Sequence, residues 1–381
     1  MKRRNLLKLF KMHKKRPLIL LGIIVVVLAI FIYKTASVYP FLFQLVFNRG
    51  INLKQTTDNR INILLLGIGG GSHDGPNLTD TIILASLDQK NDKVTLVSIP
   101  RDLWFPDISQ KVNAAYANGE ARKKGDGLIE AEAAMEKVTG QNIDYGIRLD
   151  FSGFVKSVDI VGGLDINVDN TFDDYQYPID GKEDDSCGHT PAELQSLANT
   201  PEDQLPQVFP CRYLHVHFNK GLNHMDGQTA LEFVRSRHAS QAIEASDFAR
   251  SKRQEKVIKA FKDKVLSTQT LINPGKLIGL YNTLQTSIDT DIKQDEFDDF
   301  IRLAEKMRNA KIQSVVIDQG DDTVGRPGLL INPPMTSDYN YLWTLIPRTG
   351  NGNFAEIQNY ISCEIVKGNC VVSKSPSAAF K

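Results

Sequence analysis

The sequence predicts an α/β protein, a three-layer α/β/α sandwich preceded by a transmembrane helix. Short β-branched or apolar runs between turn residues are typical of buried strands, and here they alternate with segments of helical periodicity, which predicts the sandwich. An uncharged apolar run after a basic amino terminus predicts the membrane helix. At 381 residues, the chain is long enough for one large domain or two ordinary ones.

The amino-terminal segment is first basic and then apolar. Residues 1–57 hold eleven Lys and Arg side chains and no Asp or Glu. The run 17–33 can cross a bilayer, at the short end of the usual ~17–25 residues. The basic residues 1–16 predict a cytoplasmic amino terminus, so we expect a single-pass cell-membrane protein with an extracytoplasmic body. A signal peptide cleaved near Thr35–Ser37 is the alternative, and it places the body outside the cytoplasm as well.

The remaining 324 residues are acidic. They carry 34 Lys and Arg against 45 Asp and Glu, a net charge of −11. This balance argues against nucleic acid as a partner, because binding to nucleic acid depends on neutralising phosphates with basic side chains. A site for an anion must therefore be a local concentration of arginine.

Four cysteines follow the apolar run, in a segment where disulfides can form. Three pairings are possible, and the two local ones, Cys187 with Cys211 and Cys363 with Cys370, are the simplest. A bond across the first loop would stabilise the fold by about 3 kcal/mol. The alternative is a zinc site with His189, His215 and His217, although the spacing matches no tight ligand pattern.

The body begins after a juxtamembrane linker over residues 34–59, whose aromatic side chains suit a membrane interface. Apolar runs then predict strands over 61–67, 81–87, 93–99, 143–149 and 165–168. Helical periodicity predicts helices over 127–138 and 151–161, the second ending at Gly162-Gly163.

Further along the chain, a polar stretch over 173–212 is rich in Asp, Pro and Gln, which predicts a loop insertion. Two helices follow, and then a helix near 295–309 and a strand over 312–317. We expect a catalytic domain over 60–317 and a C-terminal extension of unknown role over 318–381, with a short hairpin-like piece between Cys363 and Cys370.

The two helices carry four arginines within one stretch of nineteen residues. They are Arg235, Arg237, Arg250 and Arg253. A guanidinium is always charged and binds phosphate or carboxylate oxygens two at a time. Asp247, Arg250 and Gln254 share one helical face, which suggests a pocket for an anion. A solvated helix with surface ion pairs is the alternative.

Two carboxylates occur where predicted strands begin or end. Asp80 precedes one strand, and Arg101-Asp102 follows another, with Lys111 and Asn113 shortly after. Ligands of open α/β sheets collect at the carboxyl ends of strands. Two carboxylates with an arginine between them suit Mg²⁺, or Mn²⁺, bound to a phosphate. Alternatively, Asp80 caps a turn and Arg101 pairs locally with Asp102.

These pieces occur in the order found in a known family. The pieces are Asn62–Gly67, Thr79-Asp80-Thr81, Ser98–Asp102, Lys111–Ala115, Asp150–Phe154, Gly162–Asp165, Gly221–Leu231, Arg235-Ser236-Arg237 and Asp247–Gln254. On these motifs, residues 60–265 resemble the LytR-CpsA-Psr family of membrane-anchored cell-wall phosphotransferases. The chain has Leu78-Thr79 where the family usually has Arg-Ser, so one phosphate contact is expected to come from elsewhere.

The resemblance implies a function. Such proteins hold a polyprenyl pyrophosphate-linked glycopolymer, with its lipid tail in an apolar tunnel, and transfer the phospho-glycopolymer to a hydroxyl of peptidoglycan. Membrane lipid is then a further partner. Metal and arginine groups arranged around the diphosphate would supply most of the catalysis.

The resemblance also implies residue roles. Asp80 and Asp102 would bind the metal, and Arg101, Arg235, Arg237 and Arg250 would bind the two phosphates. Further substrate contacts are expected from Lys111, Asn113, Asp247, Arg253 and Gln254. Two other classes stay open: a membrane-tethered binder of an anionic glycan or lipid without turnover, and a hydrolase with water as acceptor.

Overall fold

The computed structural model describes residues 50–55, 60–71, 75–201, 204–321 and 325–374, except for the side chains of Asp247, Leu271 and Leu284. The predicted cytoplasmic segment 1–16 and membrane helix 17–33 lie outside these residues, as does most of the linker 34–59. Within the described ranges, no helix combines the length and the apolar composition needed to span a membrane.

The described chain divides into two units. The smaller contains residues 50–53 and 293–303, and the larger contains 54–292 and 304–374 of the described residues. The smaller unit includes the short helix η4 (Gln294–Glu296) and most of α12 (Phe297–Lys306). In it, Arg302 pairs with Asp298 and Asp299 at 2.6 Å each and donates to the carbonyl of Gly50 at 2.7 Å.

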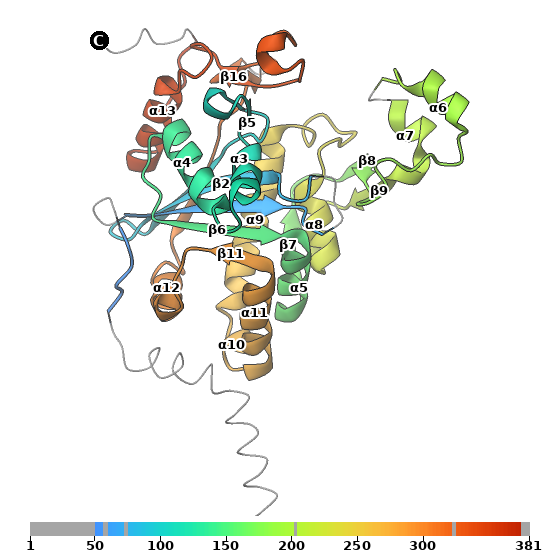
Figure 1. The fold of residues 1–381 in the computed structure, drawn as a ribbon. Coiled ribbons are helices and arrows are strands. Elements are labelled where there is room, and N and C mark those ends of the chain that lie inside the picture. Colours follow the sequence, from blue (N-terminus) through green and yellow to red (C-terminus); the bar gives the residue numbers. More distant parts are fainter. Residues whose placement is uncertain (1–49, 56–59, 72–74, 202–203, 322–324, 375–381) are drawn as a thin grey trace, which may run out of the picture. The chain divides into compact units, whose positions relative to one another are not determined.

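In the larger unit, the described residues form a mixed sheet of six strands (Figure 1). In spatial order they are β11 (Ile288–Thr290), β6 (Tyr145–Asp150), β1 (Arg60–Ile68), β2 (Thr79–Asp88), β3 (Lys93–Ser98) and β12 (Lys311–Val316). β6, β1, β3 and β12 run in one direction, while β2 and β11 run against them. The predicted α/β class is therefore confirmed, and the predicted strands are found within a few residues.

Helices lie on both faces of this sheet (Figure 1). On one face, α3 (Ala114–Arg122), α4 (Gly127–Thr139) and α13 (Ala355–Val366) bury a core against strand residues such as Leu64, Leu84 and Val97. On the other face, α5 (Phe151–Val161), α9 (Asp247–Val265) and α11 (Pro274–Ser287) contact β6, β12 and β11, respectively. The short helix α10 (Thr268–Leu271) connects α9 to α11.

Local signals explain where the predicted helices begin and end. The Asp150 carboxylate accepts the Gly153 amide at 2.7 Å and starts α5, and Gly162 ends it at φ 93°. Asp226 caps α8 (Gly227–Arg235) and Ser246 caps α9 in the same way. The alignment of these caps with the apolar periodicity is why the sequence located these helices well.

A second core lies beneath α5, α8 and α9. It is built around the strand pair β7 (Leu164–Val168) and β10 (Gly221–Met225) and around three mutually packed rings, Phe172, Phe218 and Phe233. α8 approaches α5 so closely that a Cβ added at Gly227 would lie 2.2 Å from the carbonyl oxygen of Val155. Only glycine therefore fits at that crossing.

The predicted loop over 173–212 is wrong in part. Its start belongs to β8 (Phe172–Pro178), which pairs with β9 (Tyr213–Phe218). Between these strands lie the helices α6 (Pro191–Leu197), α7 (Leu205–Val208) and η3 (Pro210–Arg212). We call β8, β9 and the residues between them the arm. Its helices were missed because the capping box of Thr190 and Glu193, with Pro191 at the first helical position, is a short signal inside a polar stretch.

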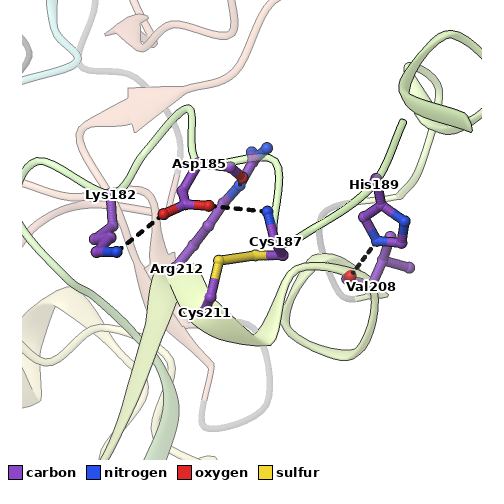
Figure 2. The surroundings of a disulfide bond; sticks show 7 residues. All are labelled: Lys182, Asp185, Cys187, His189, Val208, Cys211 and Arg212. Atoms are coloured by element: carbon purple, nitrogen blue, oxygen red, sulfur yellow. Dashed lines mark hydrogen bonds and ion pairs between the residues drawn. A yellow bond between two sulfur atoms is a disulfide. The ribbon is translucent and has the colours of Figure 1, made fainter. Parts of the chain in front are cut away.

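Both expected disulfides are present, so the predicted pairing is confirmed. Figure 2 shows Cys187 bonded to Cys211 across the arm, with the Asp185 carboxylate accepting the Cys187 amide at 2.9 Å. The zinc alternative is wrong, because both sulfurs are in the disulfide and His189 contacts the carbonyl of Val208 at 3.0 Å. The hairpin expected after Cys363 is also wrong, since α13 continues to Val366.

The chain from residue 318 onward contributes to the core. Leu329, Leu345 and Ile361 are buried in the same cluster as the strand residues of the sheet. Short strands and turns connect these positions. They are η5 (Ser337–Tyr339) and the pairs β13 (Gly320–Asp321) with β14 (Arg326–Pro327) and β15 (Leu330–Ile331) with β16 (Ile346–Pro347). Earlier in the chain, the short strands β4 (Trp104–Phe105) and β5 (Gln110–Lys111) pair across the turn η1 (Pro106–Ile108).

Candidate active site

The candidate site lies at the sheet edge where β1, β3, β6 and β12 end. β2 runs against them, so its first residues lie at the same edge. The register of β2 against β1 shifts between Gly67 and Ile68, and Asp80 falls in this irregularity, between the paired residues Thr79 and Thr81. A bulge re-aims a side chain out of the regular alternation. The irregularity therefore gives Asp80 its place beside the turn that follows β3.

That turn carries Arg101 and Asp102, and its backbone is tightly held. The Asp102 carbonyl accepts the Leu345 amide at 3.0 Å and the Thr344 hydroxyl at 2.9 Å. The backbone of Asn113 donates to the Arg101 carbonyl at 3.4 Å and accepts the Thr79 amide at 3.1 Å. Four segments far apart in sequence thus meet here, which fixes the two charged side chains relative to Asp80.

Arg101 connects the two carboxylates. Its guanidinium pairs with Asp80 through Nη1, and its Nε lies 3.6 Å from Oδ2 of Asp102. Lys111 Nζ pairs with Oδ1 of Asp102 at 2.7 Å, and Arg237 Nη2 lies 3.9 Å from Oδ2. The structure therefore gathers Asp80, Arg101, Asp102, Lys111 and Arg237 into one network, which we call the charge cluster.

The surroundings of Arg101 favour its charged form. Burial opposes the charge of Arg101, but the neighbouring carboxylates of Asp80 and Asp102 outweigh it and raise the pKa of the guanidinium above its ordinary value. The Asp102 side chain is only 12% exposed, so its ion pairs are poorly screened by solvent. Three cations around one buried carboxylate leave net positive charge, which suits an anionic ligand.

A pocket opens beside Asp80, between β2, β3, β12 and α9. Its polar lining includes Asp80, Ser98, Arg250 and Gln254, and its apolar lining includes Ile82, Ile99 and Ile317. Two predicted phosphate ligands on α9, Arg250 and Gln254, thus face the same space as the predicted metal ligand Asp80. The shared i, i+4 face of the helix explains why they point the same way.

Arg237 was expected on a helix, but the structure places it outside one. α8 ends at Arg235, and Arg237 lies in the connection to α9. A buried carboxylate on the arm, Asp174, holds this connection: its Oδ2 accepts the Ser236 hydroxyl at 2.7 Å and the amides of Arg237 and His238 at 3.1 Å each. Asp174 is 1% exposed, and sequence reasoning missed it. The only signal was a pair of aspartates in a stretch that was assigned to a loop.

Arg235 lies in a different setting from the other arginines. Its Nη2 pairs with Asp180 of the arm at 3.1 Å, and Nη1 donates to the Tyr177 hydroxyl at 3.3 Å. Its guanidinium also stacks on the Phe151 ring, 4.3 Å from the centroid. The structure therefore directs Arg235 to the arm, while Arg237 belongs to the charge cluster.

Arg253 is buried within the protein. Nε donates to the Phe233 carbonyl at 3.0 Å, Nη2 to the Ser236 carbonyl at 2.7 Å, and Nη1 to the Glu244 carboxylate at 2.8 Å. It is 3% exposed. Its contacts satisfy carbonyls at the end of α8. Arg253 thus shapes the connection that carries Arg237, in place of the substrate contact expected from the sequence.

For two further predicted site residues, Asn113 and Asp247, the structure gives the position of the backbone. Asn113 precedes α3 and joins the turns of Thr79 and Arg101 through its main chain. Asp247 opens α9, but its side chain lies outside the described residues, so its expected substrate contact stays a prediction.

The comparisons with known proteins agree with this fold. A profile of the family described as LytR_cpsA_psr matches residues 44–330, well over half of the chain. The chain belongs to the LytR-CpsA-Psr family. All members of the charge cluster lie inside the matched range.

Named relatives of this LytR-CpsA-Psr protein include TagU of Bacillus cereus, a polyisoprenyl-teichoic acid–peptidoglycan teichoic acid transferase. The two sequences are 28% identical over 251 residues, which is 65% of each chain, so the match spans a little less than two thirds of that relative. Among solved structures, the Lin1025 protein of Listeria innocua matches 82% of this chain and all of its own at TM-score 0.52 and 22% identity. TagV of B. subtilis matches 81% of this chain and 98% of its own at TM-score 0.51 and 22% identity.

Proposed function

We propose that this protein is a membrane-anchored phosphotransferase that moves a glycopolymer from a polyprenyl pyrophosphate carrier to a hydroxyl of peptidoglycan. The observation that carries the proposal is the charge cluster beside the pocket of Arg250 and Gln254. Family membership supports it, as does the activity named for the TagU relative. Residues 17–33 would anchor the protein, 60–317 would form the extracytoplasmic catalytic domain, and the lipid tail would occupy an apolar tunnel.

The reaction would be a displacement at the phosphorus that bears the polymer. The acceptor hydroxyl oxygen bonds to this phosphorus, the bond to the bridging oxygen breaks, and polyprenyl phosphate leaves with the electron pair while the hydroxyl proton is released. Negative charge grows on the leaving phosphate during this step. Arg101 and Arg237 would stabilise this charge, and Arg250 with Gln254 would hold the non-bridging oxygens.

The donor set fits a hard divalent cation. Mg²⁺ is usually bound by one or two carboxylates, several waters and substrate phosphate. Asp80 and Asp102 offer such carboxylates, and Arg101 contacts Oδ1 of Asp80. We propose that these two residues bind Mg²⁺, or Mn²⁺, together with the diphosphate. The ion would neutralise phosphate charge and orient the phosphorus for attack.

The roles of three residues differ from those expected from the sequence. Arg235 is assigned to positioning the arm through Asp180, and Arg253 is assigned to holding the connection after α8. Lys111 is assigned to orienting Asp102, since it pairs with that carboxylate at 2.7 Å. These three residues would thus act through the groups that contact substrate.

A reconstituted transfer assay tests the proposal. The full-length protein in detergent micelles is incubated with a polyprenyl pyrophosphate-linked glycopolymer and Mg²⁺, with and without peptidoglycan. We expect polymer on the peptidoglycan and free polyprenyl phosphate in the complete mixture only. Free polymer released at the same rate without peptidoglycan would indicate the hydrolase, and retained substrate without any product would indicate the non-catalytic binder.

A further inference from the structure

An exposed apolar patch lies between β15 and β16. Within nine residues, Met335, Tyr341, Leu342 and Trp343 are 59%, 71%, 46% and 46% exposed. A single exposed apolar side chain needs no explanation, but a concentration of them marks an interaction surface. We call Tyr341, Leu342 and Trp343 the aromatic patch. It lies beyond residue 330, where the family match ends.

The backbone that carries the aromatic patch is held by contacts with residues 104 and 109. Asn340 and Tyr341 both have left-handed backbone conformations, with φ of 53° and 57°, which are uncommon for residues other than glycine. The Asn340 side chain donates to the Ser109 carbonyl at 3.1 Å. The neighbouring Tyr339 ring meets the buried Trp104 ring edge-on, with 5.4 Å between centroids. Contacts on both sides thus hold the segment that exposes these side chains.

Hydrogen bonds link the segment of the patch to the turn that carries Asp102. Thr344, directly after Trp343, is buried and donates its hydroxyl to the Asp102 carbonyl at 2.9 Å. Leu345 donates its amide to the same carbonyl at 3.0 Å and accepts the Trp104 amide at 2.8 Å. A ligand on the patch would therefore lie next to the turn that carries Arg101 and Asp102.

The charge of the segment indicates what kind of ligand fits. Residues 328–347 contain no Lys or Arg and one acidic residue, Asp338. A polyanionic glycopolymer or an anionic membrane would be expected to bind basic side chains, which this segment lacks. Hydroxyl and amide side chains, such as Asn332 and Asn340, accompany the aromatic rings instead. Rings that stack on C–H faces, together with neutral hydrogen-bonding groups, suit the pyranose rings of an uncharged glycan.

We propose that the aromatic patch binds the neutral glycan strand of the acceptor and presents its hydroxyl to the charge cluster. The assignment of this glycan as the acceptor rests on the proposed function, whereas the binding itself does not.

Binding and transfer are measured separately to test this inference. The full-length protein in detergent micelles is titrated with neutral β-1,4-linked oligosaccharides of N-acetylglucosamine, without donor. Trp343→Ala and Tyr341→Ala are each expected to weaken binding about tenfold or more. Trp343→Phe should retain most of the affinity, while Trp343→Leu should lose it, because the leucine keeps apolar area but not the ring. Tyr175→Ala, at an exposed tyrosine of the arm, is the matched control.

In the transfer assay, the alanine variants are expected to raise the KM for the glycan with little change in kcat or in donor binding. Equal glycan affinity in the wild type and both alanine variants overturns the inference. So does the finding that Trp343→Ala weakens binding to vesicles of zwitterionic phosphatidylcholine but leaves glycan binding unchanged. Loss of glycan binding in the variants of a protein that shows no transfer would leave the patch established and the proposed function refuted.

Discussion

Asp102 contacts more members of the candidate site than any other residue of the charge cluster. Its carboxylate lies near three cations, and its carbonyl anchors Thr344 and Leu345. A buried carboxylate is stable only with such partners, because an unpaired buried charge is costly. The same pairs hold Arg101 and Lys111 in place before any ligand arrives, and such preorganisation is what electrostatic catalysis requires.

Replacement of Arg237 tests the role of the cluster. We expect Arg237→Ala to lower the transfer rate by about 10²–10³-fold, as removal of a transition-state hydrogen-bond donor does elsewhere. Lipid that co-purifies with the protein should change little, because its affinity depends on the apolar tail. Mass spectrometry and the transfer assay measure the two quantities. Arg122→Ala, at an exposed ion pair, is the control, and an unchanged rate in Arg237→Ala would remove the assignment.

Asp174→Asn tests how the arm positions Arg237. An amide cannot replace both acceptor oxygens, so at least one of the amides of Gln176, Arg237 and His238 loses its partner. We expect the free energy of unfolding to fall by about 1–3 kcal/mol. We also expect kcat to fall about tenfold or more with donor binding retained, because misplacement of a catalytic group affects the rate most. Asp173→Asn is the neighbouring control, and a purely structural role would leave kcat of the folded fraction unchanged.

Glu132 on α4 makes stability depend on pH. Burial, with the nearby Asp291 carboxylate, raises the pKa of Glu132 from 4.5 to about 7. The folded protein holds this proton more tightly than the unfolded chain. The contribution of Glu132 to stability is therefore fully present below pH 4.5, and it is lost as the pH rises through about 7.

Glu132→Gln should remove this contribution. We expect the variant to have a flatter stability profile between pH 5 and 7 and a higher melting temperature than the wild type at pH 8, measured by thermal unfolding. Glu130→Gln on the same helix is the control. A parallel decline in the variant and the wild type would contradict the assignment.

At the scale of elements, α9 shows what the sequence could and could not predict. Its arginines were found from their spacing, and Arg250 with Gln254 do face one pocket. Arg253, three residues after Arg250, instead donates to the carbonyls of Phe233 and Ser236 at the end of α8. That difference depends on which neighbour each face meets, and a single sequence carries no such information. Likewise, the spacing of Ile357, Ile361 and Ile365 fitted a helix, but the Lys-Gly-Asn turn before Cys370 suggested a hairpin.

The disulfide of the arm connects the two ends of its helical part. A bond between Cys187 and Cys211, 24 residues apart, stabilises the arm by about 3 kcal/mol through the entropy of the unfolded loop. We expect Cys187→Ser/Cys211→Ser to increase amide hydrogen exchange in α6 and α7, with α4 and β1 unchanged, as measured by mass spectrometry. Equal protection of the arm in both proteins would show that its other contacts suffice.

For the whole molecule, the acidic balance and the local cations have different consequences. A body of net charge −11 repels polyanions at a distance, so the cluster has to recognise diphosphate by close contacts. The order of the motifs identified the family, and the strand edges located Asp80, Arg101 and Asp102. The sequence could not show that residues beyond 318 complete the core, because apolar residues of the core and of an independent extension have the same composition.

Metal removal is the test at this scale. The stability of the described fold comes from two apolar cores and two disulfides, whereas the proposed ion lies at the sheet edge. We therefore expect EDTA to abolish transfer while the melting temperature shifts little, and added Mg²⁺ or Mn²⁺ to restore it. Full transfer in EDTA would exclude a metal requirement.

The hydrogen bonds of Thr344 and Leu345 to Asp102 have a practical consequence for anyone who shortens this protein. Similarity to the family stops at residue 330, which invites truncation there. A chain cut at that point would lose the two donors that hold the Asp102 carbonyl, together with α13. It would expose apolar side chains of the sheet to water, and aggregation of such a fragment would say nothing about the activity of the intact protein.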